Sequence, residues 1–284
     1  ILHNMYEYLK TSPGVRHERK RPEFTMELNI LSLETIFSDC SDFERRDIYF
    51  GLDNKICLPL CWLDGLTDAQ AISGGIIRPL TDILRTAPAE SPDKALELIL
   101  HGLAFSANAK QFNNTGEVVS ELTRGCCALL IPGHGAVCFE VKSQNTRSIN
   151  EPSLEKSVKG GKDSFVETLR TNTALVRRRI RDPRLKTRKL ELGRKSHTQI
   201  EILYLEGVVD PALPLEVLRR LNQIDVDSVL ATGIIEEYLM DCPRSPLPQL
   251  IHTERPDRVS KYLAEGRVGI IIDGIPIALV VPVI

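Results

Sequence analysis

Two pairs of acidic residues, at matching positions in the two halves of the chain, have the residue type and spacing that acid–base chemistry requires. Asp64 and Asp68 are four residues apart, and Glu206 and Asp210 repeat that spacing later in the chain. Paired carboxylates can act as general acid and general base. Both pairs, however, flank a glycine turn before a predicted helix, where acids cap the helix and compensate its positive end. We therefore favour a structural role and predict no catalytic residue.

Motifs for nucleotide, acyl-transfer or metal chemistry are also missing from the sequence. The run Gly160-Gly161-Lys162-Asp163-Ser164 lacks the residue order of a phosphate-binding loop and is interpreted as a turn at a helix start. No Gly-x-Ser-x-Gly occurs, and the six histidines do not pair at metal-ligand spacing. His134 lies in a Pro-Gly-His-Gly segment typical of a hairpin turn, and Cys57 and Cys61 lie among apolar strand residues. We predict no metal, no cofactor and no enzymatic activity.

The overall composition indicates a folded protein of about two domains without a strong charge bias. Hydrophobic residues make up 42% of the 284 residues and charged residues 26%, as in ordinary soluble domains. The formal net charge of -2 provides no global field toward nucleic acid or an anionic membrane. The seven cysteines, an odd number mostly in apolar runs, favour free thiols in a reducing compartment.

A dense run of basic residues is the most unusual local feature. Its members are Arg170, Arg177, Arg178, Arg179, Arg181, Arg184, Lys186, Arg188, Lys189, Arg194 and Lys195. On a helix, Arg170, Arg177 and Arg181 share one side, while Leu169 belongs to an apolar stripe. Three interpretations stay open: a solvated helix face, a contact with an anionic membrane or acidic partner, and RNA binding through segment 170–195, which lacks interleaved aromatic residues. The membrane or partner contact candidates are Arg177, Arg178, Arg181 and Arg184.

The elements that must position these residues occur twice, because the chain contains an internal repeat. Trp62-Leu63-Asp64-Gly65-Leu66-Thr67-Asp68 matches Tyr204-Leu205-Glu206-Gly207-Val208-Val209-Asp210 at an offset of 142 residues. Other glycines agree with this register, with one residue deleted in the second copy: Gly51 with Gly193, Gly125 with Gly266, and Gly133 with Gly274. Glycines mark positions that need positive φ or a close approach of the backbone, so this shared register indicates duplication.

Each copy is predicted to contain a leading helix, a strand, three helices and a closing hairpin. In the first copy these are 27–37, 55–63, 71–84, 93–100, 117–123 and the hairpin strands 127–131 and 136–141. In the second they are 164–180, 197–205, 213–224, 234–240, 257–264 and the hairpin strands 267–272 and 276–281. The sequence thus predicts an α/β (α+β) fold of two similar lobes, each a small mixed β-sheet with packed helices, related by internal duplication. The expected parts are an N-terminal tail at 1–25, a first lobe at 26–142, a linker at 143–162 and a second lobe at 163–284.

No segment of the sequence has the roughly 20 uninterrupted apolar residues that a membrane helix requires. The nearest candidate, 268–284, is broken by Asp273, Gly274 and two prolines, and no signal peptide opens the chain. These observations predict a soluble protein. Because the chain begins at Ile1 without Met and ends on an apolar Val-Val-Pro-Val-Ile run, we expect it to be a piece of a longer protein.

Several motifs of the second half resemble the GerA family of spore germination proteins. They are Arg147-Ser148-Ile149-Asn150-Glu151-Pro152 with Glu155, Phe165-Val166-Glu167-Thr168-Leu169-Arg170-Thr171-Asn172, Leu175 with Arg177-Arg178-Arg179-Ile180, Tyr204-Leu205-Glu206-Gly207, Ser245-Pro246-Leu247-Pro248-Gln249, Thr253-Glu254-Arg255-Pro256-Asp257 and Glu265-Gly266-Arg267. Residues 147–284 carry nearly all of the resemblance, and the first lobe matches mainly through 61–68. In one departure, Gly160-Gly161-Lys162-Asp163-Ser164-Phe165 replaces the family's Gly-Pro, two residues and Gly-Phe, which loosens that turn.

The resemblance implies the soluble N-terminal part of a germinant receptor A subunit, on the cytoplasmic or spore-core side of the spore inner membrane. It implies B and C subunits as partners, and a role in receptor assembly and signal transmission when nutrients trigger germination. A direct amino acid or sugar binding module, with a cleft between the lobes, is the alternative. A homo-oligomer is left open, nucleic acid is not expected as a partner, and the basic segment would face anionic headgroups of the membrane that holds the parent chain.

A hinge between the lobes is the expected mechanism. A small molecule or a neighbouring subunit in the cleft would shift an open–closed equilibrium by its differential affinity for the two states. The ligand or interdomain candidates are Glu151, Glu167, Arg170, Asn172, Arg255 and Asp257. Their other interpretation is structural, as an ion-pair and hydrogen-bond network that fixes the lobe interface.

Overall fold

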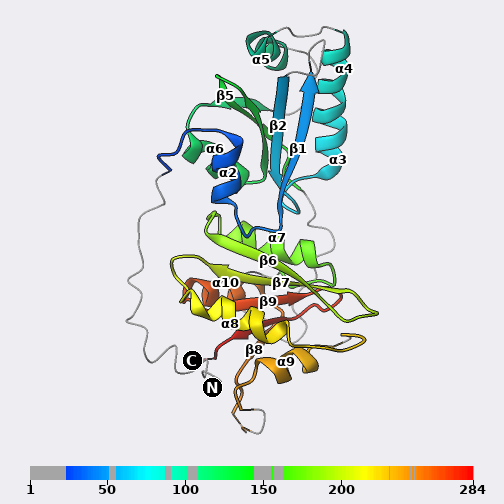
Figure 1. The fold of residues 1–284 in the computed structure, drawn as a ribbon, viewed down its shortest axis with the longest axis vertical. Helices are drawn as coiled ribbons and strands as arrows, with labels where there is room; N and C mark the ends of the chain where they lie inside the picture. The colour runs from blue at the N-terminus through cyan, green and yellow to red at the C-terminus, as the bar shows by residue number, and fades with distance from the viewer. Residues whose placement is uncertain are drawn as a thin grey trace.

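Two lobes, each built on a five-stranded sheet, follow one another along the long axis of the molecule (Figure 1). The fold comes from a computed structural model that describes residues 24–50, 56–86, 91–101, 108–143, 155, 161, 163–229, 231–242, 245 and 247–283. The predicted two-lobe α/β architecture is confirmed. The predicted tail at 1–25 and linker at 143–162 lie almost entirely outside the described residues, so these boundaries stay predictions.

The first lobe has a sheet with helices on both faces. Its elements are α2 (Ile30–Ile36), β1 (Phe43–Phe50), β2 (Ile56–Leu63), α3 (Ala69–Ile72), the π-helical turn η1 (Ser73–Ile77), α4 (Arg78–Thr86), α5 (Pro92–His101), β3 (Ala109–Phe112), α6 (Thr115–Leu122), β4 (Cys126–Ile131) and β5 (Gly135–Glu140). The strand order is β1-β2-β4-β5-β3. Apolar side chains of α2 and α6 pack on one face of the sheet, and those of α3 to α5 pack on the other.

The second lobe repeats this arrangement. Its elements are α7 (Leu169–Arg179), β6 (Leu185–Leu192), β7 (Thr198–Leu205), α8 (Ala212–Leu221), α9 (Gly233–Leu239), β8 (Ile251–Thr253), α10 (Pro256–Ala264), β9 (Val268–Ile272) and β10 (Ala278–Val281). The strand order β6-β7-β9-β10-β8 matches that of the first lobe strand for strand. Helices α8 and α9 pack on one face and α7 and α10 on the other, so the structure supports the duplication that the glycine register indicates.

The strand pairing corrects one detail of the prediction. Every pairing between the named strands is antiparallel, where mixed sheets were expected. The reason is that β1–β2, β4–β5, β6–β7 and β9–β10 are consecutive strands paired as hairpins, which are antiparallel by construction. Gly133 and Gly274 turn two of these hairpins with φ of 79° and 80°, a backbone conformation that favours glycine.

Other differences from the prediction concern four strands and the second leading helix. The structure adds β1, β3, β6 and β8, none of which was predicted, and β6 contains part of the basic run. The second leading helix begins at Leu169 rather than Ser164. Its start is delayed because the Asn172 side chain accepts from the N–H of Val166 at 2.8 Å and donates to its carbonyl, which holds the preceding segment outside the helix.

Helix α7 lies where the two lobes meet (Figure 1). Its Leu175 and Val176 belong to the core of the second lobe, whereas Ala174 packs into the core of the first. Gly65 of the first lobe allows this contact, because a Cβ added there would lie 2.9 Å from the Arg170 carbonyl oxygen. The helix therefore belongs to both cores. Among the helices of the described ranges, none is both long and apolar enough to cross a membrane.

Candidate functional site

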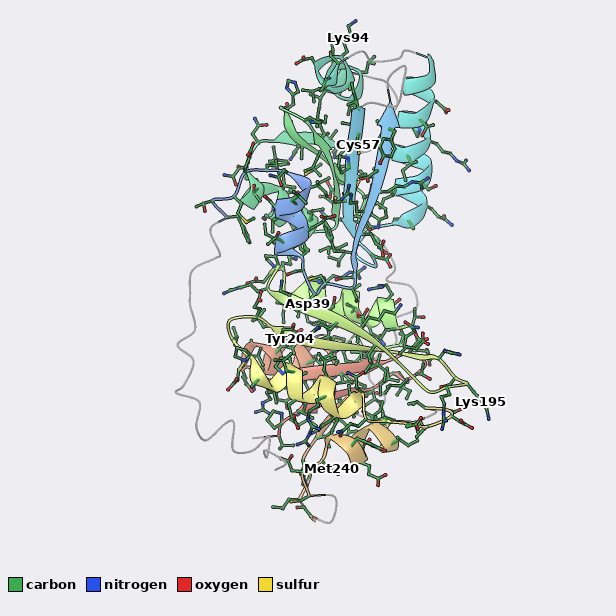
Figure 2. All side chains as sticks on the ribbon, viewed as in Figure 1. Asp39, Cys57, Lys94, Lys195, Tyr204 and Met240 are labelled. Carbon is green, nitrogen blue, oxygen red and sulfur yellow. The ribbon has the colours of Figure 1, made fainter. Side chains whose placement is uncertain are left out.

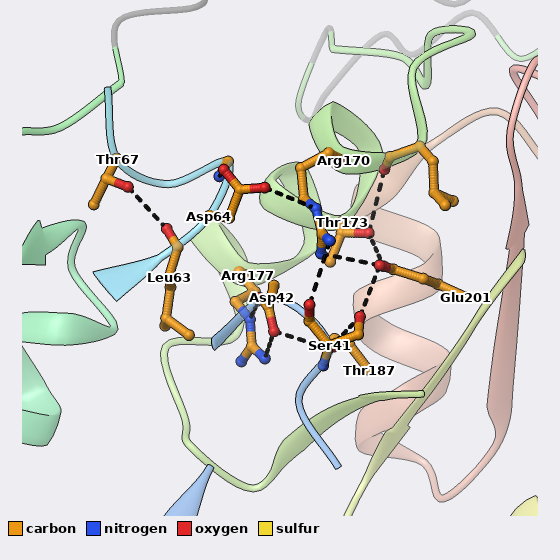
Figure 3. A network of polar contacts seen from close by, with 12 residues as sticks. Ser41, Asp42, Leu63, Asp64, Thr67, Arg170, Thr173, Arg177, Thr187 and Glu201 are labelled. Carbon is orange, nitrogen blue, oxygen red and sulfur yellow. Dashed lines mark hydrogen bonds and ion pairs between the residues drawn. The ribbon is translucent and has the colours of Figure 1, made fainter. Parts of the chain in front are cut away.

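Polar side chains of both lobes converge on the side of α7 that faces the first lobe (Figure 3). This group, called the lobe clasp below, consists of Ser41, Asp42, Arg170, Thr173, Arg177, Thr187 and Glu201. Spacings of three and four residues along α7 bring its three members to one helix face. The segment between α2 and β1 supplies the serine and the aspartate, while β6 and β7 supply the second threonine and the glutamate.

The ion pair between Asp42 and Arg177 lies at the centre of the clasp. Arg177 Nη2 donates to Asp42 Oδ1 at 2.7 Å, and Nε donates to the other carboxylate oxygen. The Asp42 side chain is 1% exposed and the Arg177 side chain 2%. Burial alone would raise the pKa of Asp42, but Arg177 and the Thr187 hydroxyl, which donates at 2.8 Å, outweigh it and lower that pKa. Burial likewise opposes the charge on Arg177, yet Asp42 raises its pKa, so the pair is held in its charged form.

Glu201 is the second buried acid of the clasp. Its Oε1 accepts from Arg170 Nη1 at 3.0 Å and from the Ser41 hydroxyl at 2.9 Å, and its Oε2 accepts from the Thr173 hydroxyl. Burial nevertheless raises the pKa of Glu201, because its side chain is fully enclosed and the donors only partly compensate. Ser41 comes from the first lobe, so this carboxylate hydrogen-bonds across the lobe boundary.

Backbone hydrogen bonds reinforce the side-chain contacts. Ser41 N–H donates to the Thr187 carbonyl at 2.8 Å, and Thr187 N–H donates to the Asp39 carbonyl at 3.0 Å. These two bonds form a single parallel bridge between Cys40 of the first lobe and Thr187 on β6. Asp39 adopts φ of 57°, a left-handed conformation that aspartate tolerates better than most residues. In Figure 2 the labelled Asp39 lies at the boundary between the lobes.

Further polar contacts surround the clasp. Lys186 is buried, and its amine donates to the Ile36 carbonyl at 3.0 Å. Arg170 also contacts Asp64 through Nε at 3.1 Å, and Arg178 donates to the Ser143 carbonyl at 3.1 Å. These contacts join the lobes on several sides of α7, so separating the lobes would break many of them together.

The five described members of the predicted ligand or interdomain set lie in different surroundings. Arg170 is a member of the clasp, and Asn172 is fully buried against the segment that precedes α7. The Glu167 side chain is exposed, while its carbonyl accepts from Gly274 N–H at 2.7 Å. Glu151 lies outside the described residues.

Arg255 and Asp257 belong to a different cluster, on the second lobe. They pair with each other at 2.6 Å beside the start of α10. Close by, Glu155 of the predicted linker accepts from the Thr253 hydroxyl at 3.0 Å and pairs with Arg258 at 2.9 Å. This linker anchor holds Glu155 against β8 and α10. Several of the residues that carried the family resemblance therefore attach the linker to the second lobe and do not line the lobe boundary.

The four basic contact candidates have different surroundings. Arg177 is buried, which removes it from the residues that could touch a membrane surface or an external partner. Arg178 is partly buried, and burial lowers its pKa. Arg181 is exposed, whereas Arg184 pairs with Asp182 at 2.8 Å. The basic run is thus divided among α7, a turn and the edge strand β6, and it does not form one continuous basic face.

Five clasp residues were missed by the sequence analysis: Ser41, Asp42, Thr173, Thr187 and Glu201. Glu201 had a readable signal, because it is the one charged residue in the otherwise apolar run Ile200–Leu205. A charge in such a buried strand needs a partner of opposite sign. The other four are short polar side chains with no distinctive pattern around them, so sequence spacing could not single them out.

The clasp joins the two lobes of one chain, and its polar groups mainly bond to one another. Its donors and acceptors satisfy one another, except that Arg177 Nη1 is buried without a hydrogen-bond partner in the described part of the chain. Within those residues, no group of three or more His, Cys, Asp or Glu could hold a metal ion. Beside the clasp, however, a cleft of about 430 Å³ opens between Asp64, Asp68 and the α7 residues Arg170 and Arg178.

Comparison with known proteins identifies sequence relatives over most of the chain. The family model described as Bacillus/Clostridium GerA spore germination protein matches residues 32–284. Spore germination protein KA of Bacillus subtilis (strain 168) is 32% identical over 271 residues, covering 94% of this chain and 49% of that protein. Spore germination protein B1 of the same organism is 34% identical over 255 residues, covering 89% and 52%. The chain therefore spans about half the length of these relatives.

A solved structure is similar to this chain over nearly its whole extent. It is the crystal structure of the N-terminal domain of the A subunit of the Bacillus megaterium spore germinant receptor GerK3. The two chains share 28% sequence identity and superpose with a TM-score of 0.70, covering 92% of this chain and 98% of that one. The match supports both the two-lobe fold and the resemblance drawn from the sequence motifs.

Proposed function

The chain belongs to the Bacillus/Clostridium GerA spore germination protein family, and on that premise we propose that it assembles a nutrient germinant receptor and transmits the germination signal. In this proposal it is the N-terminal domain of an A subunit. Support comes from the solved domain of that kind, which this chain matches along nearly all of its length. The remaining half of the relatives' length would supply the membrane part.

The observation that carries the signalling role is the lobe clasp. Asp42, Arg177 and Glu201 are charged groups taken out of water at the contact between two lobes. Such groups are stable only with their partners in place, so a partial separation leaves uncompensated charges. The lobe contact therefore favours two discrete arrangements, intact or open, over a continuous deformation. A partner that binds one arrangement better would shift the population and so convey a signal.

Location and partners follow the same proposal. The parent protein would lie in the spore inner membrane, with this domain on the cytoplasmic or spore-core side, and would assemble with B and C subunits. The exposed surfaces of both lobes are available to these subunits, since the clasp occupies only the inner faces. Whether copies of this chain also associate with each other is measured directly by light scattering on the purified chain.

A germination experiment tests the proposal. The gene that encodes this chain is altered to Asp42→Asn, with Asp47→Asn as the matched control, because Asp47 forms a partly exposed pair with Arg45 on β1. The nutrient response is compared between spores that contain equal amounts of receptor. We expect Asp42→Asn to change that response and Asp47→Asn to leave it unchanged. A wild-type response from a stable Asp42→Asn receptor would contradict signalling through the clasp. Failure of the wild-type chain to co-purify with B and C subunits would contradict assembly.

Direct binding of a small nutrient is a second candidate function. The cleft beside the clasp has about 430 Å³, within the usual range for small-molecule sites. Its lining offers both signs of charge, from Asp64 and Asp68 on the first lobe and Arg170 and Arg178 on α7. Arg178 makes a hydrogen bond to a carbonyl but no ion pair within the described residues. Three hydroxyl-bearing residues also line the cleft, and an amino acid or a sugar would match this mixture of charge and hydroxyl groups.

Calorimetry against a panel of amino acids and sugars separates the two candidates. Binding heat that disappears in Arg178→Gln and persists in Arg194→Gln would support nutrient binding in the cleft. Arg194 suits the control because it lies at the outer β6–β7 turn, beside Asp225 and Asp227. Absence of heat with every nutrient, on folded protein, would leave assembly and signalling as the function. RNA binding through 170–195 is not proposed, because Arg177 and Lys186 are buried and Arg184 is paired.

A further inference from the structure

A separate cleft between the lobes has a basic lining. It measures about 310 Å³ and lies between Phe24 with α6 of the first lobe and the turn Arg181–Pro183 that joins α7 to β6. Each lobe contributes one arginine, Arg124 at the end of α6 and Arg181 in the turn. These positions are distinct from the clasp and from the cleft considered above for nutrients.

The two arginines are not neutralised across the cleft. Arg124, which follows the end of α6, pairs with Glu121 of that helix at 2.7 Å. Arg181 is exposed and donates through Nε to the Arg178 carbonyl at 3.3 Å, with no carboxylate in ion-pair contact among the residues that the structure describes. Arg124 is thus compensated by its own lobe, and Arg181 supplies the positive charge of the cleft that has no ion-pair partner in the described ranges.

The acidic residue of the lining does not change this balance. Asp182 is engaged by the guanidinium of Arg184, with contacts of 2.8 Å to Nη2 and 3.1 Å to Nε, and also accepts from the N–H of that residue at 2.9 Å. Its carboxylate is therefore already compensated. The carbonyl end of α6 disfavours an anion nearby, but this effect is weaker than a charge-assisted hydrogen bond from a guanidinium.

The rest of the lining suits an oxyanion on a small organic group. Ser120 lines the cleft and carries a hydroxyl group, and Phe24 and Val119 bring apolar surface, whereas the hydroxyl of the neighbouring Thr123 donates to the Ser120 carbonyl at 2.9 Å. Guanidinium groups recognise phosphate with paired, charge-assisted hydrogen bonds. We propose that this cleft binds a phosphate group, on a soluble ester or a lipid headgroup, which bridges Arg124 and Arg181. The bound phosphate holds the two lobes together on a side that the clasp does not reach.

Titration of the 284-residue chain with inorganic phosphate, at constant ionic strength, tests the proposal. Amide resonances of Ser120, Thr123 and Arg124 are expected to shift together on binding. Arg124→Gln and Arg181→Gln should each weaken binding about tenfold, as expected for loss of a charge-assisted hydrogen bond. Arg194→Gln, which removes an equal charge beside the Lys195 labelled in Figure 2, should change it less than about twofold. Circular dichroism melts confirm that the variants are folded.

A second arm identifies the source of the phosphate. Vesicles of phosphatidylglycerol are compared with vesicles of phosphatidylcholine in a sedimentation assay, with inorganic phosphate as competitor. Binding of the anionic vesicles that depends on Arg124 and Arg181 assigns the cleft to a lipid headgroup, and binding of inorganic phosphate alone assigns it to a soluble ester. The proposal is overturned if neither probe binds up to about 10 mM phosphate. It is equally overturned if Arg194→Gln weakens binding as much as Arg181→Gln, because the attraction is then nonspecific.

Discussion

Arg177 and Asp42 are 135 residues apart in the sequence and form a buried two-point ion pair between the lobes. One residue comes from α7 and the other from the segment that enters β1. The pair connects the two copies of the duplicated unit, although neither copy carries the same pair within itself. Asp42 and Arg184 occupy equivalent positions in the two copies. The copies have therefore diverged here, since an acidic residue in the first lobe corresponds to a basic residue in the second.

Removal of one partner from this pair should destabilise the protein strongly. For Asp42→Asn we expect the free energy of unfolding to fall by about 3–5 kcal/mol, because Arg177 is left charged and buried without compensation. The matched control, Asp47→Asn, breaks a pair that is partly exposed, and should cost less than about 1 kcal/mol. Urea denaturation of both variants measures the difference. Equal losses would show that the buried pair contributes no more than a surface pair.

The glycine turns of the two lobes offer a test of lobe docking. Gly65 and Gly207 occupy equivalent positions with φ of 84° and 77°, so alanine is strained at both by about 1–2 kcal/mol. At Gly65 an added Cβ also meets the Arg170 carbonyl oxygen at 2.9 Å, while at Gly207 nothing lies within 4 Å. Gly65→Ala should therefore cost about 1–3 kcal/mol more than Gly207→Ala. Thermal and urea denaturation compare them, and identical costs would mean that the turn does not limit the approach of α7.

Protonation of Glu201 should make stability depend on pH. Its pKa is raised in the folded protein, so the folded state binds this proton more tightly than the unfolded state does. The free energy of unfolding should fall as pH rises from about 4.3, the ordinary glutamate value, to the raised pKa. Glu201→Gln removes this titrating group, so the free energy of unfolding of the variant should change less with pH over the same range. Urea titrations from about pH 4.5 to pH 8 measure both slopes, and parallel profiles would assign the pH dependence to other groups.

Thiol labelling should separate the described cysteines by exposure. Cys242 is exposed, whereas Cys61 and Cys127 are buried in the first lobe, and burial raises the pKa of each of these two thiols to about 12. Because the thiolate is the reactive form, iodoacetamide should modify Cys242 first. The buried thiols should react only after unfolding, as followed by mass spectrometry of peptides. Rapid modification of Cys61 in folded protein would indicate that the first lobe opens frequently.

Much of the fold could be predicted because its signals are local. A few neighbouring residues are enough to identify the glycine turns at Gly133 and Gly274 and the repeated Asp-Gly or Glu-Gly turns. The same holds for the hydrophobic periodicity of α8 and α10. Strands β1 and β6 escaped prediction for an equally local reason. They are edge strands with charged residues such as Arg46 and Lys189 toward solvent, and this polarity hides the alternation that identifies a strand.

The sequence by itself determined the duplicated lobes, the turns between their elements and membership of a family. Only the tertiary structure decided which charges meet, because Asp42 lies 135 residues from Arg177 and Arg170 lies 31 residues from Glu201, and no spacing rule selects either pair. A basic run looks the same in sequence whether its arginines face water or a buried acid. Burial separates these cases, since a charge inside the protein requires a partner that the fold alone brings to it.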